Sequence, residues 1–91
     1  MWVRWRVNGR VQGVGFRRFV QRAAGRHGVV GDVCNLPDGH VEIRASGTDD
    51  ELQRLFEDVR RGPGHSRVDG VQELAPEPVP QSTRFEIRSR A

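Results

Sequence analysis

The amino-acid sequence predicts an α+β fold in which two helices cover one face of a mainly antiparallel sheet. Two stretches carry apolar residues at helical spacing, and each lies between shorter stretches in which apolar and polar residues alternate. The resulting order is βαββαβ with a short C-terminal strand, which is typical of the ferredoxin-like two-layer sandwich. With 91 residues, of which 35% are hydrophobic, the chain is expected to form a single small domain over residues 1–91.

The first half of the chain is expected to contain three strands and a helix. Valine and tryptophan alternate with arginine over residues 3–7, which indicates a half-buried strand. Apolar residues at helical spacing over 16–27 predict a helix that stops at a glycine. The stretch VVGDVCNL at 29–36 and an alternating run at 41–45 predict two strands, joined by the Pro-Asp-Gly turn at 37–39.

The second half is expected to contain one helix and two strands. The sequence Thr-Asp-Asp-Glu at 48–51 is a capping box, and the helix behind it ends before the Gly-Pro-Gly of 62–64. Residues 68–74 predict a weaker fourth strand, and Phe85 with Ile87 marks a short last one. An extended crossover between these strands is held by three prolines, Pro76, Pro78 and Pro80.

Composition excludes several classes of function. All 15 basic residues are arginine, so Schiff-base chemistry and the lysine of a Walker P-loop are absent. The net charge of +3 mildly favours anionic ligands. The single cysteine, Cys34, excludes an internal disulfide and a cysteine zinc cluster. Without a membrane-length apolar run or a signal peptide, we expect a cytoplasmic protein with no membrane partner. A monomer is the default expectation, since no feature of the sequence indicates the oligomeric state.

The sheet face opposite the helices is expected to be open and charged. Alternation places nine residues on it: Trp2, Arg4, Arg6, Asp32, Cys34, Glu42, Arg44, Glu86 and Arg88. RNA-binding domains with this strand order stack bases on aromatic residues of the third strand. That strand reads HVEIRA here and has no aromatic residue, so an RNA-binding module remains a weak alternative and no nucleic-acid partner is expected.

The segment NGRVQGVGFRR, residues 8–18, opens the first helix without the usual cap. No Ser, Thr, Asp or Asn precedes the helix directly, and Arg17 and Arg18 face the positive end of its dipole, at a cost of roughly 0.3–1 kcal/mol. Its glycines allow backbone N–H groups to turn inward, and the guanidinium of Arg17 matches two phosphate oxygens. The arrangement therefore predicts a bound anion, most naturally a phosphoryl group. Alternatively, Arg17 belongs to a solvated face with the other arginines of the helix.

Asn35 is the second candidate for a functional residue. Strands joined by a β–α–β crossover run parallel, so the ends of the first and second strands lie at one edge of the layer. Alternation with the buried Val33 points Asn35 to the helix side of that edge, close to the glycine-rich loop. A neutral amide there could orient a water molecule. An asparagine that merely starts the turn at Pro37 is an equal alternative.

Two stretches resemble the signatures of a known family. VNGRVQGVGFR, residues 7–17, resembles the first signature of the acylphosphatase family, and GDVCNLPDGHVEIRASG, residues 31–47, resembles the second. The second departs from the family pattern at Asp32, usually aromatic, and at Cys34, usually a long polar residue. The resemblance implies a hydrolase that cleaves the carboxyl–phosphate bond of small acyl phosphates and releases inorganic phosphate. It also implies in-line attack by a positioned water, without a metal, another cofactor or a phosphoenzyme.

The resemblance also assigns roles to residues. Arg17 is implied to bind the phosphoryl oxygens and Asn35 to position the attacking water. Substrate-binding backbone N–H groups are implied at Gln12, Gly13, Val14, Gly15, Phe16 and Arg17. Two alternatives stay open: a non-catalytic phosphate-binding module, and the acylphosphatase-like module that begins larger hydrogenase-maturation proteins. The lack of zinc-finger cysteines after the domain favours a free-standing enzyme.

Overall fold

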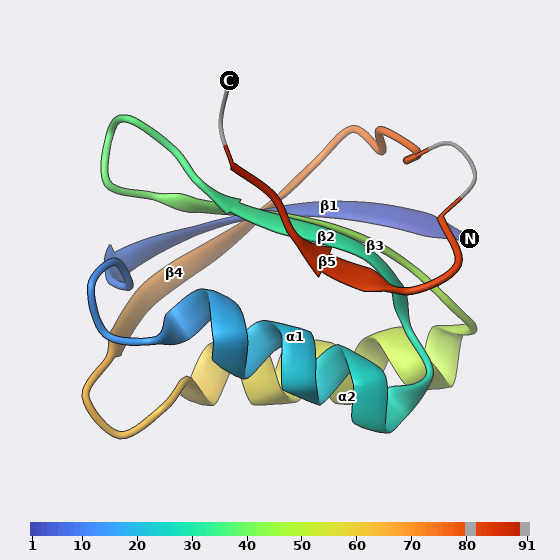
Figure 1. Cartoon of the computed structure of the whole chain (residues 1–91), viewed down its shortest axis with the longest axis horizontal. Coiled ribbons are helices and arrows are strands. Elements are labelled where there is room, and N and C mark those ends of the chain that lie inside the picture. The colour runs from blue at the N-terminus through green and yellow to red at the C-terminus, as the bar shows by residue number, and fades with distance from the viewer. Residues whose placement is uncertain (80–81, 90–91) are drawn as a thin grey trace.

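The computed structural model describes residues 1–79 and 82–89 (Figure 1). Its elements are β1 (Trp2–Arg10), α1 (Phe16–His27), β2 (Val30–Asn35), β3 (Val41–Ser46), α2 (Asp49–Arg61), β4 (Arg67–Leu74) and β5 (Phe85–Ile87). The predicted order is confirmed. β1 is longer than predicted, since β4 pairs with it as far as Arg10. Of the three prolines in the predicted crossover, Pro80 lies outside the described residues.

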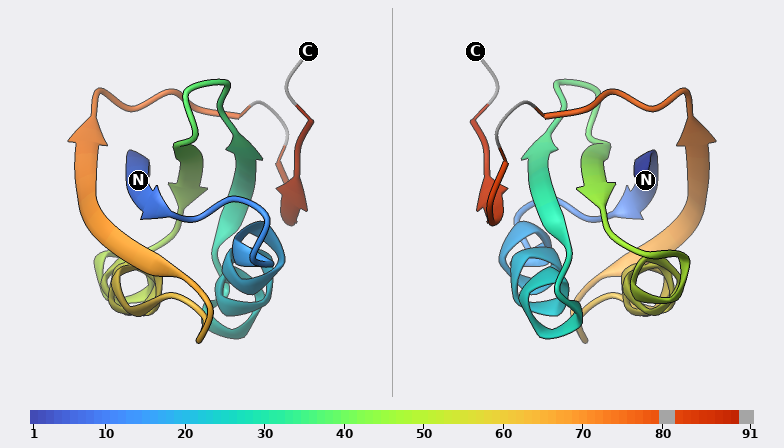
Figure 2. Two further views of the ribbon diagram at one scale, coloured as in Figure 1. Left: turned by 90° about the vertical axis from the view of Figure 1, so that its left-hand side faces the viewer. Right: turned by 90° about the vertical axis from the view of Figure 1, so that its right-hand side faces the viewer.

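The five strands form one sheet in the order β4-β1-β3-β2-β5. All pairings are antiparallel except that of β2 with β5. Both helices lie side by side on one face, so the molecule has two layers (Figures 1 and 2). Because β1 and β2 each run antiparallel to β3, their C-terminal ends emerge at the same edge of the sheet. Neither helix in the described part of the chain is long and apolar enough to cross a bilayer.

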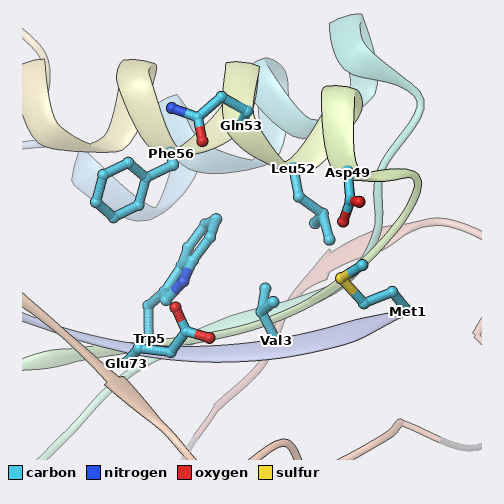
Figure 3. A pocket seen from close by; sticks show the side chains of 8 residues that line it. All are labelled: Met1, Val3, Trp5, Asp49, Leu52, Gln53, Phe56 and Glu73. Carbon is cyan, nitrogen blue, oxygen red and sulfur yellow. The ribbon is translucent and has the colours of Figure 1, made fainter.

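The hydrophobic core lies between the helices and the sheet. Its fully buried side chains come from every layer and include Val7, Val11, Phe16, Val20, Val33, Val41, Ile43, Leu55 and Val59. Near the β1–β4 edge, Trp5 packs against Phe56 with ring centroids 5.4 Å apart in an edge-to-face arrangement. Beside this pair lies a groove whose walls are shown in Figure 3; the other residues that line it are Met1, Val3, Asp49, Leu52, Gln53 and Glu73.

The face opposite the helices is more covered than the sequence predicts. Asp32 is only 4% exposed and Cys34 only 1%. Arg44 donates to both carboxylate oxygens of Asp32, at 2.9 and 2.6 Å, and Arg88 donates to it at 3.1 Å and to the Cys34 Sγ at 3.3 Å. The crossover after β4 passes over this face (Figure 2), and its Glu77 accepts a hydrogen bond from Arg44 at 3.0 Å. The prediction of an open face was wrong around Asp32 and Cys34. Alternation predicts on which side of the sheet a side chain lies, but it does not predict which other segments cover that side.

Candidate active site

The two helices begin in opposite ways. α2 has a complete capping box, in which Glu51 donates its backbone N–H to Thr48 Oγ1 at 3.1 Å and Thr48 donates its own to Glu51 Oε1 at 2.8 Å. α1 is preceded by Gly15, its N-cap residue, which has a left-handed conformation at φ 77°; the helix has no side-chain cap and no acidic residue in its first turn. The N–H groups at the start of α1 are therefore available to an external anion, as the sequence predicts.

A small pocket lies at this helix start. Its volume is about 190 Å³, less than the roughly 300 Å³ at the lower limit of pockets for drug-sized ligands. The residues that line it are Val11, Gly13, Gly15, Phe16, Arg17, Arg18, Asn35 and Ile87. The two residues that the sequence singled out for catalysis, Arg17 and Asn35, thus line one pocket. The groove of Figure 3, in contrast, contains no arginine and lies beside the capped helix.

Arg17 lies in the first turn of α1 and is half-buried. In the described part of the chain, no carboxylate lies within ion-pair distance of its guanidinium. Arg26, at the other end of the same helix, pairs with the buried Asp58 at 3.3 Å. The arginines of α1 therefore differ in their surroundings. Because Arg17 has no carboxylate partner among the described residues, its guanidinium is available to an anion bound in the pocket.

Asn35 is the last residue of β2, where it pairs with Val41. Its Oδ1 is buried and accepts no hydrogen bond from any described residue. A buried acceptor without a hydrogen bond lowers the stability of a protein by about 1–3 kcal/mol. A donor such as a water molecule at this oxygen would remove that cost. The turn that follows is closed by hydrogen bonds from the Leu36 N–H to the His40 carbonyl, at 2.8 Å, and from the Gly39 N–H to the Leu36 carbonyl, at 3.2 Å.

Two of the predicted substrate-binding residues do not line the pocket, namely Gln12 and Val14. The side chain of Gln12 turns instead to the β2–β3 turn (residues 36–40), where its Nε2 donates to the carbonyls of Leu36 and His40, each at 2.9 Å. The glycines on either side of Val14 have positive φ angles of 74° and 77°, which a Cβ would disfavour. The backbone contacts predicted for this loop remain predictions.

Asp38, one of the two carboxylates three residues from Asn35 in the sequence, is already engaged in hydrogen bonds. Asp38 accepts hydrogen bonds from the guanidinium of Arg6 and, at 3.0 Å, from the backbone N–H of His40. The His40 N–H and the Arg6 guanidinium lower the pKa of Asp38 below its ordinary value. A second hydrogen bond joins Arg6 Nε to His40 Nδ1 at 2.8 Å. These contacts make Asp38 a structural part of the turn, and it does not line the pocket.

The comparison with protein families decides the assignment. The family model for acylphosphatase matches residues 3–87. This chain belongs to the acylphosphatase family. An acylphosphatase from Koribacter versatilis is 48% identical over 85 residues, which cover 91% of this chain and 77% of that protein. One from Caldivirga maquilingensis is 46% identical over 87 residues, covering 94% and 92%.

Solved structures agree with this assignment. The crystal structure of the acylphosphatase from Bacillus subtilis superposes with a TM-score of 0.88 at 40% identity, and covers 96% of this chain and 97% of that one. HypF from T. kodakarensis contains a similar unit, with a TM-score of 0.85 and 32% identity, but this chain spans only 12% of its length. The relatives support an acylphosphatase enzyme and do not favour the non-catalytic or RNA-binding alternatives.

Three other residues that line the candidate pocket were not predicted from the sequence to belong to the site: Val11, Arg18 and Ile87. Ile87 comes from β5, which is parallel to β2 and lies beside it. No local pattern relates this residue to a loop far earlier in the chain. Val11 and Arg18 flank the glycine-rich loop, so their nearness to the site could have been inferred from the loop itself.

No group of three or more potential metal ligands occurs among residues 1–79 and 82–89. His27 is bonded to Asp58, and His40 to Arg6. Independence from metal remains a prediction, to be tested by chelation.

Proposed function

We propose that this acylphosphatase hydrolyses small acyl phosphates in the pocket between α1 and the end of β2, with Arg17 and Asn35 as its catalytic residues. The observation that carries the proposal is that both side chains line one pocket at the uncapped start of α1. In the reaction, a water oxygen forms a bond to phosphorus while the bond from phosphorus to the acyl oxygen breaks. The carboxylate leaves with the electron pair, and the water's proton passes to the phosphate.

Phosphoryl binding is assigned to the start of α1. Backbone N–H groups of residues 12–17 and the positive end of the helix dipole face the bound oxygens. The guanidinium of Arg17 adds two parallel hydrogen bonds and a full charge, which stabilise the negative charge of the transition state. The lack of a carboxylate partner for Arg17 in the described part of the chain supports this role.

Water positioning is assigned to Asn35. Its buried and unpaired Oδ1 supports this role, because an attacking water donates a hydrogen bond to such an atom. An acyl phosphate has a good leaving group, so positioning and charge stabilisation suffice and no strong base is needed. The engagement of Asp38 by Arg6 and His40 agrees with a reaction that does not use this carboxylate as its base.

We further propose that the chain acts as a cytoplasmic monomer with one domain over residues 1–91 and without a nucleic-acid partner. Among the described residues, the one large hydrophobic side chain that is extensively exposed is Met1, at 64%. Residues 1–79 and 82–89 therefore present no extended apolar surface for a stable partner. Size-exclusion chromatography with light scattering tests the oligomeric state directly.

The decisive experiment is hydrolysis of benzoyl phosphate by the purified protein in EDTA. Turnover that survives chelation and is lost in folded Arg17→Ala and Asn35→Ala variants would support the proposal. Chelation that abolishes turnover, with zinc or magnesium restoring it, would contradict the metal-independent mechanism. If folded wild-type protein bound phosphate without any turnover, the chain would be an anion-binding module.

A further inference from the structure

We infer that the side chain of Gln12 is a positioning residue that holds Asn35 in place relative to the bound phosphoryl group. The inference rests on the water-positioning role proposed for Asn35. It assigns Gln12 a function through its side chain, in addition to the backbone contact that the family resemblance implies.

The geometry of the Gln12 amide is specific. A primary amide nitrogen carries two N–H groups, and here it has two acceptors, the carbonyls of Leu36 and His40, both at 2.9 Å. Leu36 directly follows Asn35, and its own N–H donates to the His40 carbonyl. One side chain therefore holds both ends of the turn that directly follows Asn35.

No other hydrogen bond between described residues joins the β1–α1 loop (residues 11–15) to the β2–β3 turn. The ladder between β1 and β3 ends at the pair of Val7 with Val41. Beyond that pair, β1 continues to Arg10 beside β4 alone, so the sheet no longer joins it to β3. Arg6 ties the turn to the strand through Asp38 and His40, and Gln12 ties the turn to the loop itself.

This bridge matters for the alignment of the reaction more than for binding. The loop and Arg17 bind the phosphoryl group, whereas Asn35, directly before the turn, orients the water. In-line attack depends on the relative position of these two segments, and a displacement of about 1 Å can lower a rate by about 100-fold. Binding of inorganic phosphate requires only the loop and Arg17. Loss of the bridge should therefore lower kcat and leave phosphate affinity nearly unchanged.

The test is the Gln12→Met variant, which keeps the length of the side chain and adds no charge beside the anion. Both carbonyls retain another donor, since Leu36 O also accepts from the Gly39 N–H and His40 O from the Leu36 N–H. The variant is therefore expected to fold. We expect kcat for benzoyl phosphate to fall by about 10-fold or more, with the Ki for phosphate changed less than about threefold.

Gln21→Met is the matched control. Gln21 is also partly buried and donates from Nε2 to a backbone carbonyl, that of Phe85 at 3.2 Å. We expect its kcat to stay within about twofold of wild type, so a general effect of losing a glutamine hydrogen bond would show equally in both variants. If Gln12→Met does not fold, Gln12→Ala and Gln12→Asn provide the same comparison with shorter side chains.

A double-mutant cycle with Asn35→Ala separates positioning from a merely structural role. If Gln12 acts through Asn35, Gln12→Met has little further effect on kcat once Asn35 is alanine. Additive losses, or a raised Ki with unchanged kcat, would overturn the inference. The Asn35 side-chain amide signals in NMR spectra follow its position without any turnover. They should shift in Gln12→Met and not in Gln21→Met, and an unmoved signal contradicts the inference even if the proposed hydrolysis fails.

Discussion

Asp32 on β2 and Arg44 on β3 are cross-strand partners, joined by two hydrogen bonds of 2.9 and 2.6 Å beneath the crossover. Arg88 supplies a third hydrogen bond to the same buried carboxylate, at 3.1 Å. A buried charge is tolerated only when it is paired and hydrogen-bonded, and these two arginines meet that requirement. An ion-pair cluster thus occupies this position, where the family resemblance implies an aromatic residue, on the face away from the pocket.

Asp32→Ala should therefore destabilise the fold without altering the chemistry. Removing one partner of a buried ion pair leaves the other charges uncompensated, and we expect a loss of about 3 kcal/mol in the free energy of unfolding. Urea denaturation at neutral pH measures it. Activity per folded molecule should remain, since Asp32 does not line the pocket. Asp69→Ala removes an exposed ion pair and should have no measurable effect on stability; equal losses in both variants would refute this account.

Arg17→Ala should abolish most activity and leave the fold intact. Loss of one charged donor to the transition state lowers kcat/KM by about 100-fold or more. Its stability should be unchanged or slightly raised, by about 0.3–1 kcal/mol, because a cation no longer faces the start of α1. Arg17→Lys should also lose most of the activity, since an ammonium group does not reproduce the paired hydrogen bonds of a guanidinium. Steady-state kinetics with thermal melting measures both effects; full activity of Arg17→Lys would contradict the assigned role.

Asn35→Ala should lower kcat by about 100-fold and leave the Ki for phosphate within about threefold of wild type. The reason is that the phosphoryl site remains while the water loses its hydrogen-bond acceptor. Asn35→Asp is an informative companion, because its carboxylate places a negative charge beside the anion and should also weaken phosphate binding. Kinetics with phosphate as a competitive inhibitor distinguishes the two effects. A proportionate rise in the Ki of Asn35→Ala would assign Asn35 to binding instead.

The Asp58 cluster between the helices should make stability depend on acid pH. Burial raises the pKa of Asp58, but hydrogen bonds and charges from His27, Arg61 and Arg26 outweigh it and hold the pKa below its ordinary value of 3.8. A carboxyl whose pKa is lowered by folding contributes its full stability above the unfolded pKa, and loses it as the pH falls through the folded pKa. Wild-type stability should therefore decline below about pH 4.

Asp58→Asn should make that decline shallower, because the amide does not titrate in this range. Urea denaturation at a series of pH values from about 5 to about 2.5 measures the slope. Glu57→Gln, at an exposed neighbouring position of α2, should keep the wild-type slope. Parallel pH curves for wild type and Asp58→Asn would show that the cluster does not contribute to acid sensitivity.

Local signals predicted the helices and much of the site. The capping box and the Gly-Pro-Gly sequence predicted both ends of α2, which runs from Asp49 to Arg61. The missing cap of α1 indicated an anion site. The shared edge of β1 and β2 predicted that Asn35 would lie beside the glycine-rich loop, and both line one pocket. These features depend on neighbours in sequence or on a general rule of topology, so a single sequence contains them.

Contacts between side chains from distant segments could not be predicted in this way. Nothing local indicates that Arg88 and Glu77 join the cluster over Asp32, or that Ile87 lines the pocket. The two acceptors of Gln12 are backbone carbonyls. Every residue has a backbone carbonyl, so the types of these residues do not indicate the contact. Alternation indicated the side of the sheet for each residue. Burial of Asp32 depended on the long arginine side chains and the crossover that cover it.

The short length of β5 has a consequence for how the pocket opens. This strand has only three residues and pairs with β2 at the edge of the sheet, yet its Ile87 forms part of the pocket wall. An edge strand with few paired residues can detach from its sheet by local unfolding, which requires less free energy than unfolding of the whole molecule. The pocket proposed for catalysis should therefore be disrupted more easily than the core around Trp5. Hydrolysis should then be lost at a lower urea concentration than the native tryptophan fluorescence.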